Sequence, residues 1–332
     1  MVFRMQETKK PKLPVLAIDL GGTKIITAII SNSGQVMAKE YQLTLADKGP
    51  QLVIERILSA IDYLLSLRNM NSSQLASITI AAAGAINFDK GVITSSPNLP
   101  GWHDVPLRDI VKEKYRVNTF LINDASAAAL GEHRLGAGRG VSNLIYLTVS
   151  TGIGGGIIIN GKLYSGQCGG AGEIGHMTID VNGPRCNCGN IGCFEVLASG
   201  TAVAKEAIRR IRQGEGSSLI EIVAGKIENI TAEKVEVAAR GGDSLALETI
   251  SRAATYLGVG MVNLVNIFNP EMIIVGGGMS NMGDLLLNPA RQVVKERAFQ
   301  LLAQAVRIVP AQLGEDAGVL GAAIFAFEQG AD

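Results

Sequence analysis

Two segments of the chain each have the pattern of a strand, a glycine-rich turn and a second strand. This repeated pattern limits the folds that the chain can adopt. The first covers residues 15–30 with its turn at 21–24, and the second covers residues 144–159 with its turn at 150–156. A strand that returns through glycines predicts a β-hairpin, whereas Walker loops and dinucleotide-binding loops lead from a strand into a helix. Glycines also let the backbone approach phosphate oxygens closely. The sequence therefore predicts two hairpins whose turns can each bind a phosphate group.

Helical and extended patterns fill the rest of the chain. Apolar residues recur at helical spacing in residues 52–67, 201–212, 243–268 and 284–299. Short apolar runs predict strands over residues 77–83, 119–122 and 272–275, residues 95–102 predict an exposed loop, and residues 317–327 predict a buried helix too short to cross a bilayer. A chain of 332 residues, 47% of them hydrophobic, is long enough for two domains. These patterns predict an α/β protein.

One histidine and three cysteines lie close together in a pattern typical of a metal site. They are His176, Cys186, Cys188 and Cys193. Three thiolates and one imidazole complete the tetrahedral shell of zinc, and such a site is structural because no position remains for an activated water. The alternative, packed thiols or disulfides, suits small secreted chains better than this one. We predict a structural zinc ion that holds a loop, and we assign no role to Cys168.

Charge and hydropathy exclude several classes of protein. Lysine plus arginine and aspartate plus glutamate number 30 each, so no overall field attracts nucleic acid or an anionic membrane. Six of the first ten residues are polar or charged, and Asp19 interrupts the apolar run that follows, so we expect neither a signal peptide nor a membrane span. The sequence predicts a cytoplasmic protein that binds neither nucleic acid nor membrane.

Five motifs occur in an order that resembles the ROK family of repressors, open reading frames and sugar kinases. They are Asp-Leu-Gly-Gly-Thr-Lys at 19–24, Asn-Asp-Ala at 123–125, Thr-Gly-Ile-Gly-Gly-Gly at 151–156, Glu-Ile-Gly-His at 173–176 and the cysteine-rich run at 186–195. The resemblance implies the actin-like ATPase fold, which is ribonuclease H-like, with a nucleotide and a sugar in the cleft between two α/β lobes. It implies an N-terminal lobe of residues 1–122 plus 315–332 and a C-terminal lobe of residues 123–314 with the zinc loop.

Phosphoryl transfer from ATP requires donors for the phosphates, Mg²⁺ and a base. The residues predicted to contact ATP and Mg²⁺ are Asp19, Gly21, Gly22, Thr23, Lys24, Thr151, Gly152, Gly276, Gly277 and Gly278, of which the last three are implied by the resemblance alone. Asp19 lies at the end of the first strand, where a carboxylate can hold Mg²⁺ directly or through water. The alternative is that each glycine turn is only a hairpin.

Asp124 is the predicted general base, which takes the proton from a sugar hydroxyl as the oxygen attacks the γ-phosphorus. Its alternative role is to cap a helix, because aspartate is common at that position. The resemblance implies that five further residues contact the sugar, namely Asn98, Asn123, Glu173, His176 and Glu195. His176 would serve both the zinc ion and the sugar through its two ring nitrogens.

The resemblance implies an ATP-dependent hexose kinase, most similar to a glucokinase that makes glucose 6-phosphate. N-acetylmannosamine, N-acetylglucosamine or another hexose is the alternative acceptor, because contacts around C2 of the sugar decide between them. A sugar-binding regulator without catalysis is an alternative of another class, although only 14 residues precede the first strand and a DNA-binding domain needs roughly 50. We expect a hexose and ATP as partners and a homodimer or higher homo-oligomer.

Overall fold

The computed structural model describes residues 13–88, 90–96 and 98–330, and it divides into two compact units. Unit 1 extends to Asp124 and resumes at Ala322, and unit 2 comprises Ala125–Gly321. Each unit has its own hydrophobic core. The predicted lobes, residues 1–122 with 315–332 and residues 123–314, stay a prediction.

Unit 1 is built on a five-stranded mixed sheet. Its strands lie in the order β3 (Val36–Leu43), β2 (Lys24–Ile30), β1 (Val15–Leu20), β4 (Ile78–Ala82) and β8 (Thr119–Asn123). β1 and β3 are antiparallel to β2, whereas β4 is parallel to both β1 and β8. The unit also contains helices α1 (Pro50–Leu67) and α2 (Leu107–Tyr115) and a small sheet of β5 (Ala85–Asn87), β6 (Val92–Ser95) and β7 (His103–Val105).

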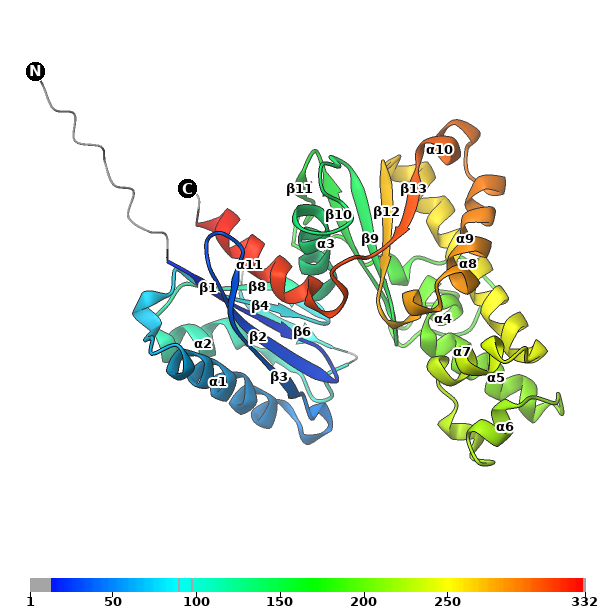
Figure 1. The fold of residues 1–332 in the computed structure, drawn as a ribbon, viewed down its shortest axis with the longest axis horizontal. Helices are drawn as coiled ribbons and strands as arrows, with labels where there is room; N and C mark the ends of the chain where they lie inside the picture. Colours follow the sequence, from blue (N-terminus) through cyan, green and yellow to red (C-terminus); the bar gives the residue numbers. More distant parts are fainter. Residues whose placement is uncertain (1–12, 89, 97, 331–332) are drawn as a thin grey trace, which may run out of the picture. The chain divides into compact units, whose positions relative to one another are not determined.

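Unit 2 contains a second five-stranded sheet with the same topology. Its order is β11 (Lys162–Leu163), β10 (Ile153–Ile159), β9 (Leu144–Val149), β12 (Met272–Gly276) and β13 (Arg307–Pro310). β9 and β11 are antiparallel to β10, and β12 is parallel to both β9 and β13. The hairpin β9–β10 therefore corresponds to the hairpin β1–β2, and the labels in Figure 1 let the two sheets be compared strand by strand.

Most helices of the chain belong to unit 2. They are α3 (Asp124–Arg134), α4 (Phe194–Ala198), α5 (Gly200–Arg212), α6 (Leu219–Ile222), α7 (Ala232–Arg240), α8 (Ser244–Phe268), α9 (Asp284–Arg297), α10 (Gln300–Ala305) and the start of α11 (Ala317–Gln329). The predicted helices and strands are confirmed, with shifts of a few residues at their ends. Among the described residues, every helix is too short or too polar to cross a membrane.

The helix that follows the last strand of each sheet packs on the other sheet. α3 follows β8 of unit 1 but lies against β10 of unit 2, where Ala125 and Ala129 face the glycines of that strand. α11 follows β13 of unit 2, and its Phe325 meets Phe120 of β8 edge to face, with ring centroids 6.2 Å apart. Each sheet therefore depends on a helix that the chain reaches only after completing the other sheet.

The second glycine turn is shorter than predicted. The turn covers only residues 150–152, and β10 begins at Ile153, so Gly154, Gly155 and Gly156 lie within a strand. A Cβ on Gly155 would lie 2.5 Å from Cδ1 of Ile174, and a Cβ on Gly156 would lie 2.5 Å from Cβ of Ala129. These glycines therefore let neighbouring segments approach the strand, which the sequence pattern did not reveal.

The loop over residues 95–102 is also less exposed than predicted. Leu99 is 0% exposed and Trp102 is 1% exposed, and both belong to the core of unit 1. Apolar side chains anchor the loop, because a turn-rich sequence does not prevent its large residues from reaching the core.

We expect Gly156→Ala to destabilise the protein by roughly 1–3 kcal/mol, because the new methyl group overpacks the contact with α3. Neither Gly156 nor Gly216 has a positive φ angle, and a Cβ on Gly216 has no heavy atom within 4 Å, so Gly216→Ala is a matched control with little expected effect. Thermal unfolding of the two variants compares them directly. Equal midpoints would show that β10 accommodates the methyl group.

Candidate functional site

Two carbonyl groups of the first glycine turn accept hydrogen bonds from one residue, Thr44. Thr44 is fully buried, and its hydroxyl donates to the carbonyl oxygen of Gly21 at 2.7 Å while its N–H donates to that of Thr23 at 2.9 Å. Among the described residues, no acceptor pairs with the N–H groups of Gly22 and Thr23. Two consecutive N–H groups without an acceptor form a site for an anion. A Cβ on Gly22 would lie 2.7 Å from the carbonyl oxygen of Asn98, so only glycine fits there.

Two carboxylates lie at the carboxyl ends of parallel strands in unit 1. Asp19 near the end of β1 pairs with Ala81 of β4, which pairs with Ile122 of β8, and Asp124 follows two residues later as the first residue of α3. Asn123, the last residue of β8, immediately precedes Asp124 in the sequence. The pKa of Asp19 is raised to about 7, mainly by burial and also by the Asp124 charge, while the Lys24 charge partly opposes the rise. Closely placed acids of this kind bind a divalent cation well.

We expect the pKa of Asp19 to make the ligand-free protein less stable as pH rises. The folded protein retains this proton until about pH 7, whereas the unfolded chain releases it near pH 3.8. The stability contributed by the proton is therefore complete below about pH 4 and is lost as pH approaches 7. Between pH 5 and 8 the unfolding free energy of the wild type should fall by roughly 2 kcal/mol more than that of Asp19→Asn. Urea unfolding at both pH values measures this difference, and equal slopes would contradict it.

The second glycine turn repeats the arrangement of the first. The N–H of Gly200 donates to the carbonyl oxygen of Ser150 at 2.8 Å, and the hydroxyl of Thr201 donates to that of Thr151 at 2.7 Å. For the N–H groups of Thr151 and Gly152, the described part of the chain again supplies no acceptor. Each hairpin thus presents two consecutive N–H groups, with a threonine and a backbone N–H holding the carbonyls behind them.

Glu195 lies directly against the second turn. This residue is in the first turn of α4, and its Oε2 accepts a hydrogen bond from the N–H of Ile153 at 2.9 Å. A Cβ on Gly152 would collide with the same carboxylate. Glu195 therefore supports the second glycine turn, whereas the family resemblance implied only a sugar contact for it.

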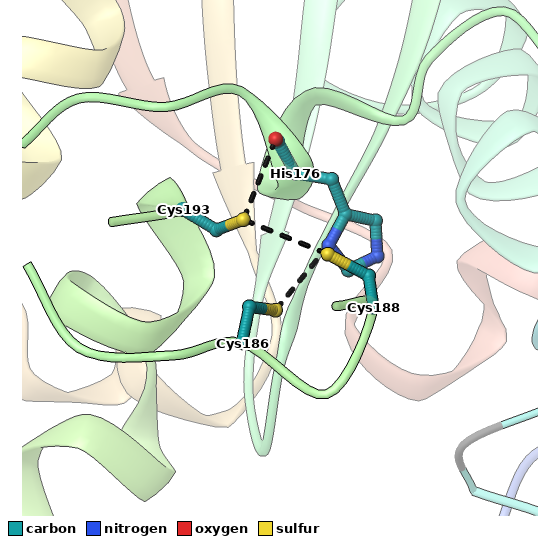
Figure 2. A group of neighbouring side chains, drawn as sticks. All are labelled: His176, Cys186, Cys188 and Cys193. Atoms are coloured by element: carbon teal, nitrogen blue, oxygen red, sulfur yellow. Dashed lines mark hydrogen bonds between the residues drawn. The ribbon is translucent and has the colours of Figure 1, made fainter. Parts of the chain in front are cut away.

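The four predicted zinc ligands come together in unit 2 (Figure 2). Their ligand atoms all lie within 4.8 Å of one another. The sulfurs of Cys188 and Cys193 are 3.7 Å apart, and the sulfur of Cys186 is 3.7 Å from Nδ1 of His176. Zinc–sulfur bonds of about 2.3 Å in a tetrahedron place sulfurs about 3.8 Å apart. The cluster therefore has the donor set and the spacing of a zinc site.

His176 presents different nitrogens in two directions. Nδ1 faces the cysteines, whereas Nε2 lies 3.9 Å from a carboxylate oxygen of Glu173. A carboxylate beside the outer nitrogen of a metal-binding histidine fixes the orientation of the ring. Burial raises the pKa of Cys193 to about 12, so a cation is needed to hold this group as a thiolate at neutral pH.

In the third glycine turn, at the end of β12, close packing within unit 2 requires glycine at two of the three positions. A Cβ on Gly276 would collide with the hydroxyl of Tyr146, and a Cβ on Gly277 would lie 2.5 Å from the carbonyl oxygen of Val149. Gly278 is different, because its nearest neighbour would be Oγ of Ser150 at 3.8 Å. The third turn lies beside the second glycine turn, and its contact with adenosine stays a prediction.

The sequence pattern did not reveal Thr44 and Thr201, which hold carbonyl groups of the first and second glycine turns. Each threonine hydroxyl is far from its acceptor in sequence, by 23 residues for Thr44 and 50 for Thr201. A lone threonine carries no motif, so only the correspondence between the two sheets could have pointed to this pair.

Comparison with known proteins relates the chain to both kinases and repressors. The profile of the ROK family matches residues 15–329. A glucokinase from Thermotoga maritima is 38% identical over 313 residues, which cover 94% of this chain and 97% of that protein. A xylose repressor from Caldicellulosiruptor bescii is 36% identical over 308 residues, which cover 92% of this chain and 76% of the repressor.

Solved structures confirm the predicted actin-like ATPase fold. A ROK family glucokinase from Streptomyces griseus, in complex with glucose and AMPPNP, matches with a TM-score of 0.82 at 32% identity, covering 95% of this chain and 99% of that one. A ROK hexokinase from Thermus thermophilus matches with a TM-score of 0.79 at 33% identity, covering 96% of this chain and 99% of that one.

Proposed function

Because the chain belongs to the ROK family, we propose that it is a glucokinase-like hexose kinase, which transfers the γ-phosphoryl group of ATP to the 6-hydroxyl of glucose. The observation that carries the proposal is the pair of matching glycine turns, each with two consecutive N–H groups that lack an acceptor among the described residues. One of these turns follows the strand that carries Asp19. Phosphate donors next to a half-buried carboxylate suit a nucleotide with its metal ion.

In the proposed reaction Asp124 is the general base. Its carboxylate accepts the proton of the sugar 6-hydroxyl as that oxygen attacks the γ-phosphorus, and the bond from the γ-phosphorus to the ADP oxygen breaks. Asp124 is the first residue of α3, and the N-terminus of a helix favours a negative charge. The N–H groups of Gly22 and Thr23 and of Thr151 and Gly152 donate to the phosphate oxygens.

The charged groups of unit 1 fit Mg²⁺, and the cysteine cluster of unit 2 fits zinc. Asp19 would hold Mg²⁺ directly or through water, and Lys24 would add positive charge beside the phosphates. Mg²⁺, when bound to ATP, neutralises charge on the transferring group. The zinc ion would be structural, because all four of its positions are filled by protein atoms.

We propose Asn98, Asn123, Glu173, His176 and Glu195 as the sugar contacts. The three residues of unit 2 are grouped by the zinc cluster, since Glu173 lies beside His176 and Glu195 follows Cys193 by two residues. The zinc ion would therefore fix the part of the sugar site that this unit supplies. Similarity to the glucokinases supports glucose as the sugar whose 6-hydroxyl accepts the phosphoryl group. An N-acetylhexosamine or another hexose is the alternative.

Turnover with Mg²⁺-ATP against a panel of hexoses and N-acetylhexosamines tests the proposal. We expect ADP release that depends on a sugar, fastest with glucose. Faster release with another sugar would keep the kinase and change its acceptor. No release with any sugar that binds would contradict the proposal and favour a sugar-binding regulator, a second candidate that the repressor relative supports.

The predicted homo-oligomer also stays a proposal. Three large apolar side chains of unit 2 are exposed, namely Ile267 near the end of α8 at 71% and Phe299 and Leu301 at the start of α10 at 69% and 68%. A second copy of the chain would cover such exposed apolar side chains.

A further inference from the structure

We propose that Glu195 couples sugar binding to nucleotide binding, by joining a sugar hydroxyl and the second phosphate turn through the two oxygens of one carboxylate. This inference rests on the proposed function. It makes Glu195 a positioning residue for the turn in addition to its proposed contact with the sugar. The expected consequence is that each substrate raises the affinity of the other.

One oxygen of Glu195 is committed to the turn. Its Oε2 accepts from the N–H of Ile153 at 2.9 Å, at the point where β10 leaves the turn. A Cβ on Gly152 would lie 3.1 Å from Cδ of Glu195 and closer still to Oε2, so the carboxylate is packed against the turn. Movement of this carboxylate would therefore displace the N–H groups of Thr151 and Gly152.

The other oxygen is available for a ligand. Within the described part of the chain, Oε1 of Glu195 accepts no hydrogen bond, and the side chain is partly exposed. A hydroxyl donor on the sugar can therefore bind Oε1 while Oε2 still accepts from Ile153. A carboxylate accepts such bonds on both oxygens, and each bond fixes the plane of the group.

The backbone around Glu195 is held firmly, so the carboxylate is the adjustable part. Phe194 is 0% exposed, and its N–H donates to the carbonyl oxygen of Met177 at 2.8 Å. Its ring lies so close to Gly260 of α8 that a Cβ on that residue would be 2.5 Å from the ring. Cys193 on the other side belongs to the zinc cluster. A sugar bound to Oε1 would thus order the carboxylate on a rigid support.

When one ligand orders a group of the protein, the second ligand no longer has to bear the entropy cost of ordering it. The resulting coupling is reciprocal, so each ligand raises the affinity of the other by the same factor. The sugar fixes the carboxylate, the carboxylate fixes the N–H of Ile153, and the turn is then ready for the nucleotide phosphates. The contacts from Gly200 and Thr201 also support the turn, but they end on its carbonyl groups and include no carboxylate oxygen that a sugar hydroxyl could bind. Thr201 therefore provides a contrast to Glu195.

The test is calorimetric binding of Mg²⁺-AMPPNP with and without saturating glucose, or with the hexose that turnover identifies. In the wild type we expect glucose to raise AMPPNP affinity at least fivefold, the lower end of typical coupling. Glu195→Asp is about 1.5 Å shorter and cannot reach both partners, so the factor should fall below about twofold. Glu195→Gln keeps the length and one hydrogen-bonding atom for each partner, and it should retain roughly threefold coupling or more. Thr201→Val should weaken AMPPNP binding about equally in both conditions and leave the factor unchanged.

The outcomes distinguish failure of the inference from failure of the proposed function. Hexose-dependent turnover with an unchanged coupling factor in Glu195→Asp overturns the inference and leaves the kinase in place. Loss of glucose binding in Glu195→Asp with wild-type AMPPNP affinity also overturns it, because the turn would then not depend on Glu195. A wild type that binds no hexose overturns both. A reduced factor in Glu195→Asp, together with an unchanged factor in Thr201→Val, supports the inference.

Discussion

Replacement of Asp124 by asparagine should lower kcat by roughly 10²–10⁴-fold, the usual contribution of a general base. The amide cannot accept the proton of the sugar hydroxyl. It has nearly the same size as the carboxylate, and asparagine is as good at a helix N-terminus, so folding should be unaffected. Glucose affinity should change by no more than about threefold, because the contacts to the other hydroxyl groups stay in place. Steady-state kinetics and calorimetry with glucose measure the two effects separately.

Asp109→Asn is the matched control for this experiment. Asp109 also lies in the first turn of a helix of unit 1, and its side chain is 50% exposed beside Arg108. The change in charge is the same, but we place Asp109 outside the proposed site and expect normal turnover. Retained turnover in Asp124→Asn would rule out the base and leave Asp124 with helix capping alone.

Replacement of Cys188 by serine should remove zinc and destabilise the protein by about 4 kcal/mol or more, since loss of a metal site is among the largest effects of a single substitution. Cys188 is exposed, so the serine itself disturbs little packing. The midpoint of thermal unfolding should fall by roughly 10 °C. Sugar affinity should fall as well, because the zinc ion would group Glu173, His176 and Glu195. Metal analysis by mass spectrometry, thermal unfolding and glucose titration measure these effects.

Cys168→Ser is the matched control for the cysteine. Cys168 is also exposed, but it lies outside the cluster of four ligands. It should keep one zinc ion per chain and normal stability. Full zinc content in Cys188→Ser would contradict the assignment of that residue as a ligand.

The sequence predicted the parts of the site that depend on neighbouring residues. The cluster proposed to bind zinc was found because His176 and the three cysteines lie within one short segment, and the first hairpin was found because its glycines interrupt apolar strands. The actin-like fold and the family came from the order of several motifs. These features could be predicted from the sequence because the residues of each motif are close together in the chain.

Features that depend on distant contacts could not be read in the same way. Nothing near Gly154–Gly156 distinguishes a turn from a strand that must admit α3, since the packing partners Ala125 and Ala129 lie elsewhere in the chain. The bond from Ile153 to Glu195 joins residues 42 positions apart. The hydrogen bonds by which Thr44 and Thr201 support the first and second glycine turns also join residues far apart in the sequence, so only the structure reveals them.

The packing of α3 and α11 on each other's sheets has a consequence for dissecting this protein. A fragment that ends after β8 lacks the α11 segment that contacts Phe120, and a fragment that begins after α3 leaves the glycines of β10 uncovered. Neither half would be an autonomous domain, although each carries a complete sheet. To reconstitute the protein from two polypeptides, the chain would instead have to be cut within a surface loop. The cut should leave α3 joined to β8 and α11 joined to β13.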